Sequence, residues 1–274
     1  MTTNRINKLF ETKQLGILSI YFCAGHPTLD GTVDTIRALE ANGVDMIEVG
    51  IPFSDPMADG PVIQDAATKS LRNGMTLRTL FSQLEKLNRG PSSSSPLGEA
   101  GRGLPLILMG YMNPIYRYGY EAFFRRCQEV GIDGVIIPDL PFADYLNEVK
   151  PVADRFDVRV IMLITPETSE ERIRFIDQHT DGFIYMVSSA ATTGTQHEFD
   201  AAKQAYFTRI SQMNLQHPRM IGFGVSNQQT YAAAAANAAG VIIGSKFVSL
   251  LEELHDPEAA IQQLRTLVGL PQVK

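Results

Sequence analysis

The chain has 274 residues, of which 44% are hydrophobic and 20% charged, and its formal net charge at pH 7 is −6. This length and hydrophobic content are typical of a globular protein with a substantial core, built as one large domain or two small ones. The acidic balance disfavours a nucleic-acid-binding protein, because such proteins usually carry an excess of basic residues on one face.

Short apolar runs recur along the chain and predict eight β-strands, at residues 16–23, 45–50, 105–111, 134–138, 158–164, 182–187, 219–224 and 240–244. Several are almost continuously apolar, which is typical of strands covered on both faces. Stretches with helical apolar spacing lie between the strands, at residues 32–41, 77–87, 120–130, 142–152, 169–178, 201–213, 227–239 and 246–254. The alternation predicts an α/β fold, a single (β/α)8 TIM barrel that spans residues 1–274 as one domain.

Three segments lie outside this repeat. Residues 4–14 predict a short extra helix against the N-terminal end of the barrel, and residues 61–73 predict an added helix after the second strand. Residues 90–103 are rich in Gly, Ser and Pro and precede the third strand. We expect this low-complexity segment to be a flexible surface loop without a catalytic role. Thr168 or Ser169, and Ser226, are candidate N-caps of the helices that follow them.

A carboxylate, Glu48, interrupts the apolar run of the second predicted strand. Because strand residues alternate between the two faces, Glu48 points into the barrel if Ile47 and Val49 pack against the helices. A carboxyl group in apolar surroundings tends to have a raised pKa, which suits a proton donor near neutral pH. The alternative is a structural Glu that a buried partner satisfies.

A second carboxylate, Asp59, lies in the loop after this strand. Its alternative interpretation is a turn residue, since Asp-Gly-Pro is a common turn sequence. The same interpretation is favoured for Asp55, which lies in Ser-Asp-Pro.

Glycine-rich backbone follows the last three predicted strands, at residues 188–195, 222–226 and 244–245. Loops at the ends of strands seven and eight commonly bind phosphate in this fold, and backbone N–H groups at a helix N-terminus favour an anion. The alternative is that these glycines only end strands. The five histidines are scattered and form no metal-binding motif, so no metal site is predicted.

These segments together resemble the tryptophan synthase α subunit family. The resemblance runs through residues 47–60, which read Ile-Glu-Val-Gly-Ile-Pro-Phe-Ser-Asp-Pro-Met-Ala-Asp-Gly. It continues through residues 61–64, 109–114, 137–141, 185–194, 222–224 and 244–245. Only the 90–103 segment has no counterpart in it.

The resemblance implies a lyase of tryptophan biosynthesis that cleaves indole-3-glycerol phosphate by a retro-aldol step to indole and glyceraldehyde 3-phosphate. Glu48 is then the acid/base group, Asp59 accepts the indole N–H, and Tyr185 supports the site. Thr193 and Gly194 belong to a loop that closes over the substrate and holds Asp59. The implied substrate- and phosphate-binding residues are Tyr21, Ile63, Tyr111, Thr193, Gly194, Gly224, Gly244 and Ser245.

Two positions and one segment depart from the family pattern. Tyr21 stands where the family usually has Phe beside the indole, and His26 replaces the more usual Asp in the loop after the first strand. Residues 188–193 read Ser-Ser-Ala-Ala-Thr-Thr, where family members often carry Arg and Gly.

The resemblance also implies a partner, the β subunit of an α2β2 complex. That subunit would carry pyridoxal phosphate, and this chain would have no cofactor. Pro52, Asp55 and Pro56 are candidates for the partner contact, or else rigid turn residues. Three alternatives stay open: a mainly allosteric subunit with weak turnover, a stand-alone indole-releasing lyase, and a different phosphate-binding barrel.

Cellular location follows from features that the sequence lacks. No stretch approaches the 18 apolar residues of a membrane span, and the polar N-terminal residues do not resemble a signal peptide. The two cysteines, Cys23 and Cys127, predict no disulfide framework. We therefore expect a cytoplasmic protein with no membrane or nucleic-acid contact.

Overall fold

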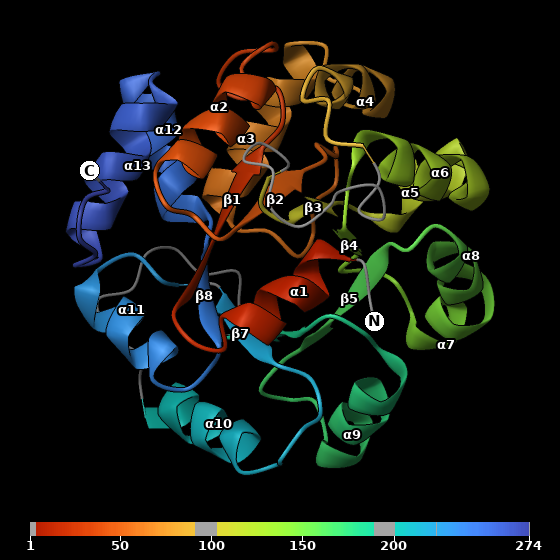
Figure 1. Cartoon of the computed structure of the whole chain (residues 1–274), viewed down its shortest axis with the longest axis vertical. Coiled ribbons are helices and arrows are strands. Elements are labelled where there is room, and N and C mark those ends of the chain that lie inside the picture. Colours follow the sequence, from red (N-terminus) through yellow and green to blue (C-terminus); the bar gives the residue numbers. More distant parts are fainter. Residues whose placement is uncertain (1–3, 91–102, 189–200, 223, 274) are drawn as a thin grey trace.

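A closed barrel of eight parallel strands forms the centre of the molecule (Figure 1). The computed structural model describes residues 4–90, 103–188, 201–222 and 224–273. Each strand pairs with the next, and the last pairs with the first. The strands are β1 (Ile17–Cys23), β2 (Met46–Gly50), β3 (Leu106–Met109), β4 (Gly134–Ile136), β5 (Arg159–Ile164), β6 (Ile184–Val187), β7 (Arg219–Gly222) and β8 (Gly240–Ile243). All eight predicted strands and the TIM-barrel fold are thereby confirmed.

Helices surround the barrel (Figure 1). They are α1 (Arg5–Thr12), α2 (Thr32–Ala41), α3 (Pro61–Arg72), α4 (Leu77–Glu85), α5 (Met112–Tyr118), α6 (Tyr120–Val130), α7 (Phe142–Asp144), α8 (Lys150–Arg155), α9 (Glu170–His179), α10 (Ala201–Ser211), α11 (Gln228–Ala235), α12 (Ser245–Leu254) and α13 (Pro257–Leu267). The extra helices predicted at residues 4–14 and 61–73 are confirmed as α1 and α3.

The helix predicted at residues 142–152 differs from the observed one. It is divided into α7, a π-helical turn at Tyr145–Val149, and α8. Pro151 has no N–H to donate, so an uninterrupted α-helical ladder cannot run through this segment. Two further helices, α5 and α13, were not predicted. Gly119, with φ +90°, separates α5 from α6, and Asp256 caps α13 by accepting bonds from the first-turn N–H groups.

The alternation of side chains along the strands produces two buried layers. Inward-facing residues form an interior cluster, which includes Ile17, Met46 and Ile107. Residues on the opposite strand face, such as Ile47 and Val49, pack between the strands and the helices. Because the neighbours of Glu48 on both sides belong to the outer layer, the side chain of Glu48 faces the barrel interior.

Helix α1 closes the N-terminal end of the barrel and crosses its middle in Figure 1. Ile6 is fully buried within the interior cluster. The Asn4 side chain donates to the carbonyls of Asp133 and Asp157, at 2.9 and 2.7 Å, just before β4 and β5 begin. With this end filled, the C-terminal end of the strands is where a ligand can enter.

Residues 91–102 of the low-complexity segment lie outside the described residues. The described chain on either side shows that the segment joins the end of α4 to the N-terminal end of β3. Its flexibility, and the assignment of residues 1–274 to one domain, stay predictions. None of the described helices has the length and apolar character needed to span a membrane.

Candidate active site

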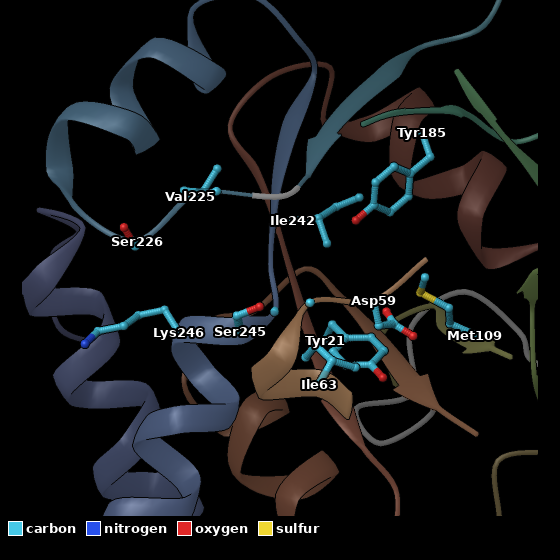
Figure 2. Close-up of a pocket in the computed structure, with 13 residues that line it drawn as sticks. Tyr21, Asp59, Ile63, Met109, Tyr185, Val225, Ser226, Ile242, Ser245 and Lys246 are labelled. Atoms are coloured by element: carbon cyan, nitrogen blue, oxygen red, sulfur yellow. The ribbon is translucent and has the colours of Figure 1, made fainter. Parts of the chain in front are cut away.

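A cavity opens at the C-terminal ends of the strands and measures about 630 Å³, counted out to the solvent. Figure 2 shows the side chains that surround it. The lining residues are Tyr21, Asp59, Gly60, Ile63, Met109, Tyr185, Gly224, Val225, Ser226, Ile242, Gly244, Ser245 and Lys246.

Glu48 lies in the barrel wall beside this cavity and is fully buried. Its Cα is paired in the sheet with Tyr21 on β1 and with Ile107 on β3. The Ser19 hydroxyl donates to Oε1 at 2.9 Å, whereas Oε2 has no hydrogen-bond partner among the described residues. Burial raises the pKa of Glu48 to about 8, and the Ser19 bond opposes this rise. The group is therefore mostly protonated at neutral pH.

Asp59 is also buried, at 7% exposure, and lines the cavity directly. Burial raises the pKa of Asp59 to about 6, and a bond from the Tyr111 hydroxyl to Oδ2, at 2.8 Å, opposes the rise. The Asp59 N–H donates to the Pro56 carbonyl, so the residue forms a turn as well as facing the cavity. Asp59 is thus mostly ionised at pH 7, whereas Glu48 is mostly neutral.

Tyr111 fixes the Asp59 carboxylate from behind. Its hydroxyl accepts a bond from the Ala58 N–H at 3.0 Å, and its ring stacks on Phe53 with centroids 5.2 Å apart. Tyr111 is not among the described residues that line the cavity. It therefore contacts Asp59 in this structure, while the predicted substrate contact stays a prediction.

Two tyrosines extend into the cavity, each beside a glycine on the next strand. A Cβ added at Gly50 would lie 2.2 Å from the Tyr21 hydroxyl, and one added at Gly222 would lie 2.2 Å from the Tyr185 hydroxyl. The glycines therefore provide the space for the rings. Burial raises the pKa of both tyrosines well above the ordinary value, and the charges of Glu48 and Asp59 raise it further. Both carboxyl groups thus lie within electrostatic reach of both rings.

The opposite side of the cavity is mainly backbone and forms the candidate phosphate site, which we define as Gly224, Gly244 and Ser245. Gly224 has φ +76°, a conformation that glycine adopts readily. The first intrahelical bond of α12 runs from Val248 N–H to the Gly244 carbonyl, so the preceding N–H groups point out of the helix N-terminus. Figure 2 shows Ser245 turned toward the cavity and the Lys246 amine turned away. Backbone dipoles, more than Lys246, would therefore favour an anion here.

Most of the predicted site residues meet at this cavity: Tyr21, Asp59, Ile63, Tyr185, Gly224, Gly244 and Ser245 line it. Glu48 and Tyr111 lie beside it, in contact with Ser19 and Asp59 respectively. Thr193 and Gly194 lie outside the described residues. Their predicted roles therefore stay predictions.

Several lining residues were not predicted from the sequence. Met109 and Ile242 stand two positions after an inward-facing residue of β3 and β8, so strand alternation was the signal that would have found them. Ser226 also lines the cavity, but the predicted N-cap at this position is wrong. Asn227 caps α11, because its side chain accepts from the Thr230 N–H at 3.0 Å. Within the described ranges, no cluster of three or more His, Cys, Asp or Glu side chains could hold a metal ion.

Comparisons with known proteins agree on one family. A family model described as tryptophan synthase alpha chain matches residues 9–273. The tryptophan synthase alpha chain of Phocaeicola vulgatus is 64% identical over 262 residues, covering 95% of this chain and 97% of the relative. That of Bacteroides fragilis is 61% identical over 267 residues, covering 97% of both.

Solved structures show the same likeness. The crystal structure of tryptophan synthase subunit alpha from Legionella pneumophila aligns with a TM-score of 0.80 at 32% identity, covering 97% of this chain and 98% of that one. A crystal structure of tryptophan synthase from M. tuberculosis aligns with a TM-score of 0.78 at 28% identity, covering 97% of both chains.

Proposed function

The chain belongs to the tryptophan synthase alpha chain family, and from this premise we propose that it cleaves indole-3-glycerol phosphate to indole and glyceraldehyde 3-phosphate. The observation that carries the proposal is the pair of buried carboxyl groups, Glu48 and Asp59, with different charge states at neutral pH. A carbon–carbon bond next to an indole breaks when the ring first becomes an electron sink. This requires a proton donor at the ring carbon and a negative charge near the ring nitrogen.

Glu48 is the acid and base of the proposed reaction. Its protonated carboxyl donates a proton to the indole carbon that bears the side chain. The resulting carboxylate then takes the proton of the adjacent glycerol hydroxyl, the carbon–carbon bond breaks, and its electron pair returns to the ring. The products are indole and an aldehyde, and Glu48 regains its proton. The Ser19 bond to Oε1 holds the carboxyl group, which leaves Oε2 for the substrate.

Asp59 accepts the indole N–H and balances the positive charge that develops on the ring. Its pKa of about 6 supports this role, because the group is mostly ionised at pH 7. Tyr111 keeps the carboxylate in place. Tyr21, Ile63 and Tyr185 contact the substrate in the proposed complex.

The substrate phosphate binds at Gly224, Gly244 and Ser245. Anchoring this remote group orients the reacting end relative to Glu48, so binding energy contributes to the rate. Thr193 and Gly194 complete the proposal as part of a loop that closes over the substrate and excludes water.

The chain works with the tryptophan synthase β subunit in an α2β2 complex, and the loop after β2 is the proposed contact. Met57 in this loop is 85% exposed, next to Pro56 and Asp55, so the loop presents an apolar side chain that a partner could cover. We assign pyridoxal phosphate to the β subunit and no cofactor to this chain. We also propose a cytoplasmic location, which the two free, buried cysteines support.

Indole release from indole-3-glycerol phosphate by the purified chain, with and without a β subunit, tests the proposal. We expect release that stops in Glu48→Gln, while inorganic phosphate still binds. Release only with the β subunit would favour the allosteric alternative, and full release without it would favour the stand-alone lyase. Undiminished release by Glu48→Gln would refute the assignment of Glu48.

A further inference from the structure

His26, in the loop after β1, is almost completely buried, at 2% exposure, and its ring contacts the side chain of Glu252 on α12. Its Nε2 lies 2.5 Å from Oε2 of Glu252. Glu252 is two turns along the helix whose N-terminus contributes Ser245 to the candidate phosphate site. The contact therefore joins the loop after β1 to the phosphate-binding helix.

A lysine completes the contact. The Lys69 amine on α3 lies 2.7 Å from Oε1 of Glu252 and 2.9 Å from Asp65. Each oxygen of the Glu252 carboxylate thus has its own partner, one on the loop after β1 and one on α3. Because α3 also carries Ile63, the Glu252 carboxylate connects three elements that surround the cavity.

The loop that carries His26 is itself held firmly. The Ser70 hydroxyl donates to the Ala24 carbonyl at 2.5 Å, and the Asn73 amide donates to the carbonyls of Gly25 and Pro27 at 2.9 and 3.0 Å. The backbone at His26 is therefore held in place, so that the His26 ring can fix the position of α12.

The ring donates from Nε2 in its neutral form. Nδ1 is buried and finds no partner within residues 4–90, 103–188, 201–222 and 224–273. Protonating it would bury an N–H without an acceptor. Burial lowers the pKa of His26, opposed by Glu252 and Asp65 and aided by Lys69, the charged groups around it on α12 and α3. A neutral ring with its hydrogen on Nε2 is thus the form that bonds to the Glu252 carboxylate.

A second contact links β1 itself to the start of α12. A Cβ built on Gly244 would lie 3.4 Å from the Tyr21 ring, so the ring packs against the glycine that precedes the helix. Tyr21 therefore positions the N-terminus of α12, and His26 holds the helix two turns further along. Two contacts at separate points define the direction of the helix axis, and hence the direction of its terminal N–H groups.

We infer that His26 is a positioning residue for the phosphate site, acting through Glu252 to aim the N-terminus of α12 at the bound anion. This inference rests on the proposed function, because it takes the phosphate of that substrate as the anion. It assigns a role to one of the positions at which the chain departs from the family pattern.

The test measures inorganic phosphate binding by calorimetry, together with KM and kcat for indole release, in His26→Ala and His26→Gln. For His26→Ala we expect the phosphate Kd and the KM to rise by about fivefold to tenfold, with kcat changed by less than about twofold. His26→Gln, whose amide can donate from nearly the same position, should restore both values to within about twofold. A merely structural role would lower stability without this separation of KM from kcat.

The chain contains a matched control. His217 also contacts a carboxylate, with Nδ1 3.1 Å from Oδ1 of the buried Asp177, but it precedes β7 at the opposite end of the barrel. His217→Ala should therefore leave the phosphate Kd unchanged, even where it lowers thermal stability. If His26→Ala does not fold, Glu252→Ala tests the same contact from the partly exposed side and should raise the phosphate Kd in the same way.

The outcomes separate the two proposals. Phosphate binding by the unaltered chain with equal affinity in His26→Ala and Glu252→Ala would overturn the role of His26 alone. An unaltered chain that neither binds phosphate nor releases indole would overturn the proposed function, and this inference with it. If His217→Ala weakens phosphate binding as much as His26→Ala does, a specific role for His26 is also refuted.

Discussion

Replacing Glu48 by Gln should make the stability of the protein less sensitive to pH. Glu48 is fully buried, and burial raises its pKa from the ordinary 4.5 to about 8. Between these values the unfolded chain releases a proton that the folded chain keeps, so wild-type stability falls as pH rises. Gln does not titrate, and it keeps an oxygen that can accept the Ser19 bond.

The size of the effect follows from the two pKa values. Each pH unit between them lowers the wild-type free energy of unfolding by up to about 1.4 kcal/mol. Integrated from pH 5 to pH 8, the difference between Glu48→Gln and wild type should move by about 3.5 kcal/mol in favour of the variant. The unpaired Gln N–H groups lower the variant's stability equally at every pH, so they do not alter this change.

Urea denaturation of both proteins at pH 5, 6, 7 and 8 measures the difference, with the exposed Glu11→Gln as the control for loss of one carboxylate. Groups other than Glu48 titrate in both proteins and cancel in the difference. A difference between Glu48→Gln and wild type that stays constant over this range would show that Glu48 ionises in the folded protein as it does in water. The proposed proton donor would then lack its physical basis.

Three further predictions concern the cavity. Tyr111→Phe removes the bond that lowers the pKa of Asp59, so the acid limb of the pH–rate profile for indole release should move above about pH 6; an unmoved limb would mean that Asp59 does not govern it. Gly222→Ala places a Cβ 2.2 Å from the Tyr185 hydroxyl and should displace the ring, lowering kcat/KM by at least about tenfold in steady-state assays, and wild-type kinetics would refute a role for the ring position. Gly244→Val crowds the start of α12 against Tyr21 and should weaken inorganic phosphate binding, measured by calorimetry, by at least about tenfold; an unchanged Kd would move the phosphate elsewhere.

Local pattern was enough to predict the barrel. Near-continuous apolar runs indicate strands that are covered on both faces. Because these strands alternate with amphipathic helices, few folds other than a barrel bury both faces of the sheet. The bounds of α2 and α6 agree with the prediction, because the helical apolar spacing begins and ends next to helix-terminating residues there. Alternation around Glu48 also predicted an inward carboxylate, since Ile47 and Val49 are apolar residues that pack outward.

The contacts that define the site were decided only by the tertiary structure. The sequence places 51 residues between Asp59 and Tyr111, and 225 between His26 and Glu252, and no local pattern specifies that either pair should meet. Closing the barrel brings these side chains together at the ends of neighbouring strands and helices. The raised pKa of Glu48 has the same origin, because desolvation depends on what surrounds a group in space, and the chain segments that exclude water from it are distant in sequence.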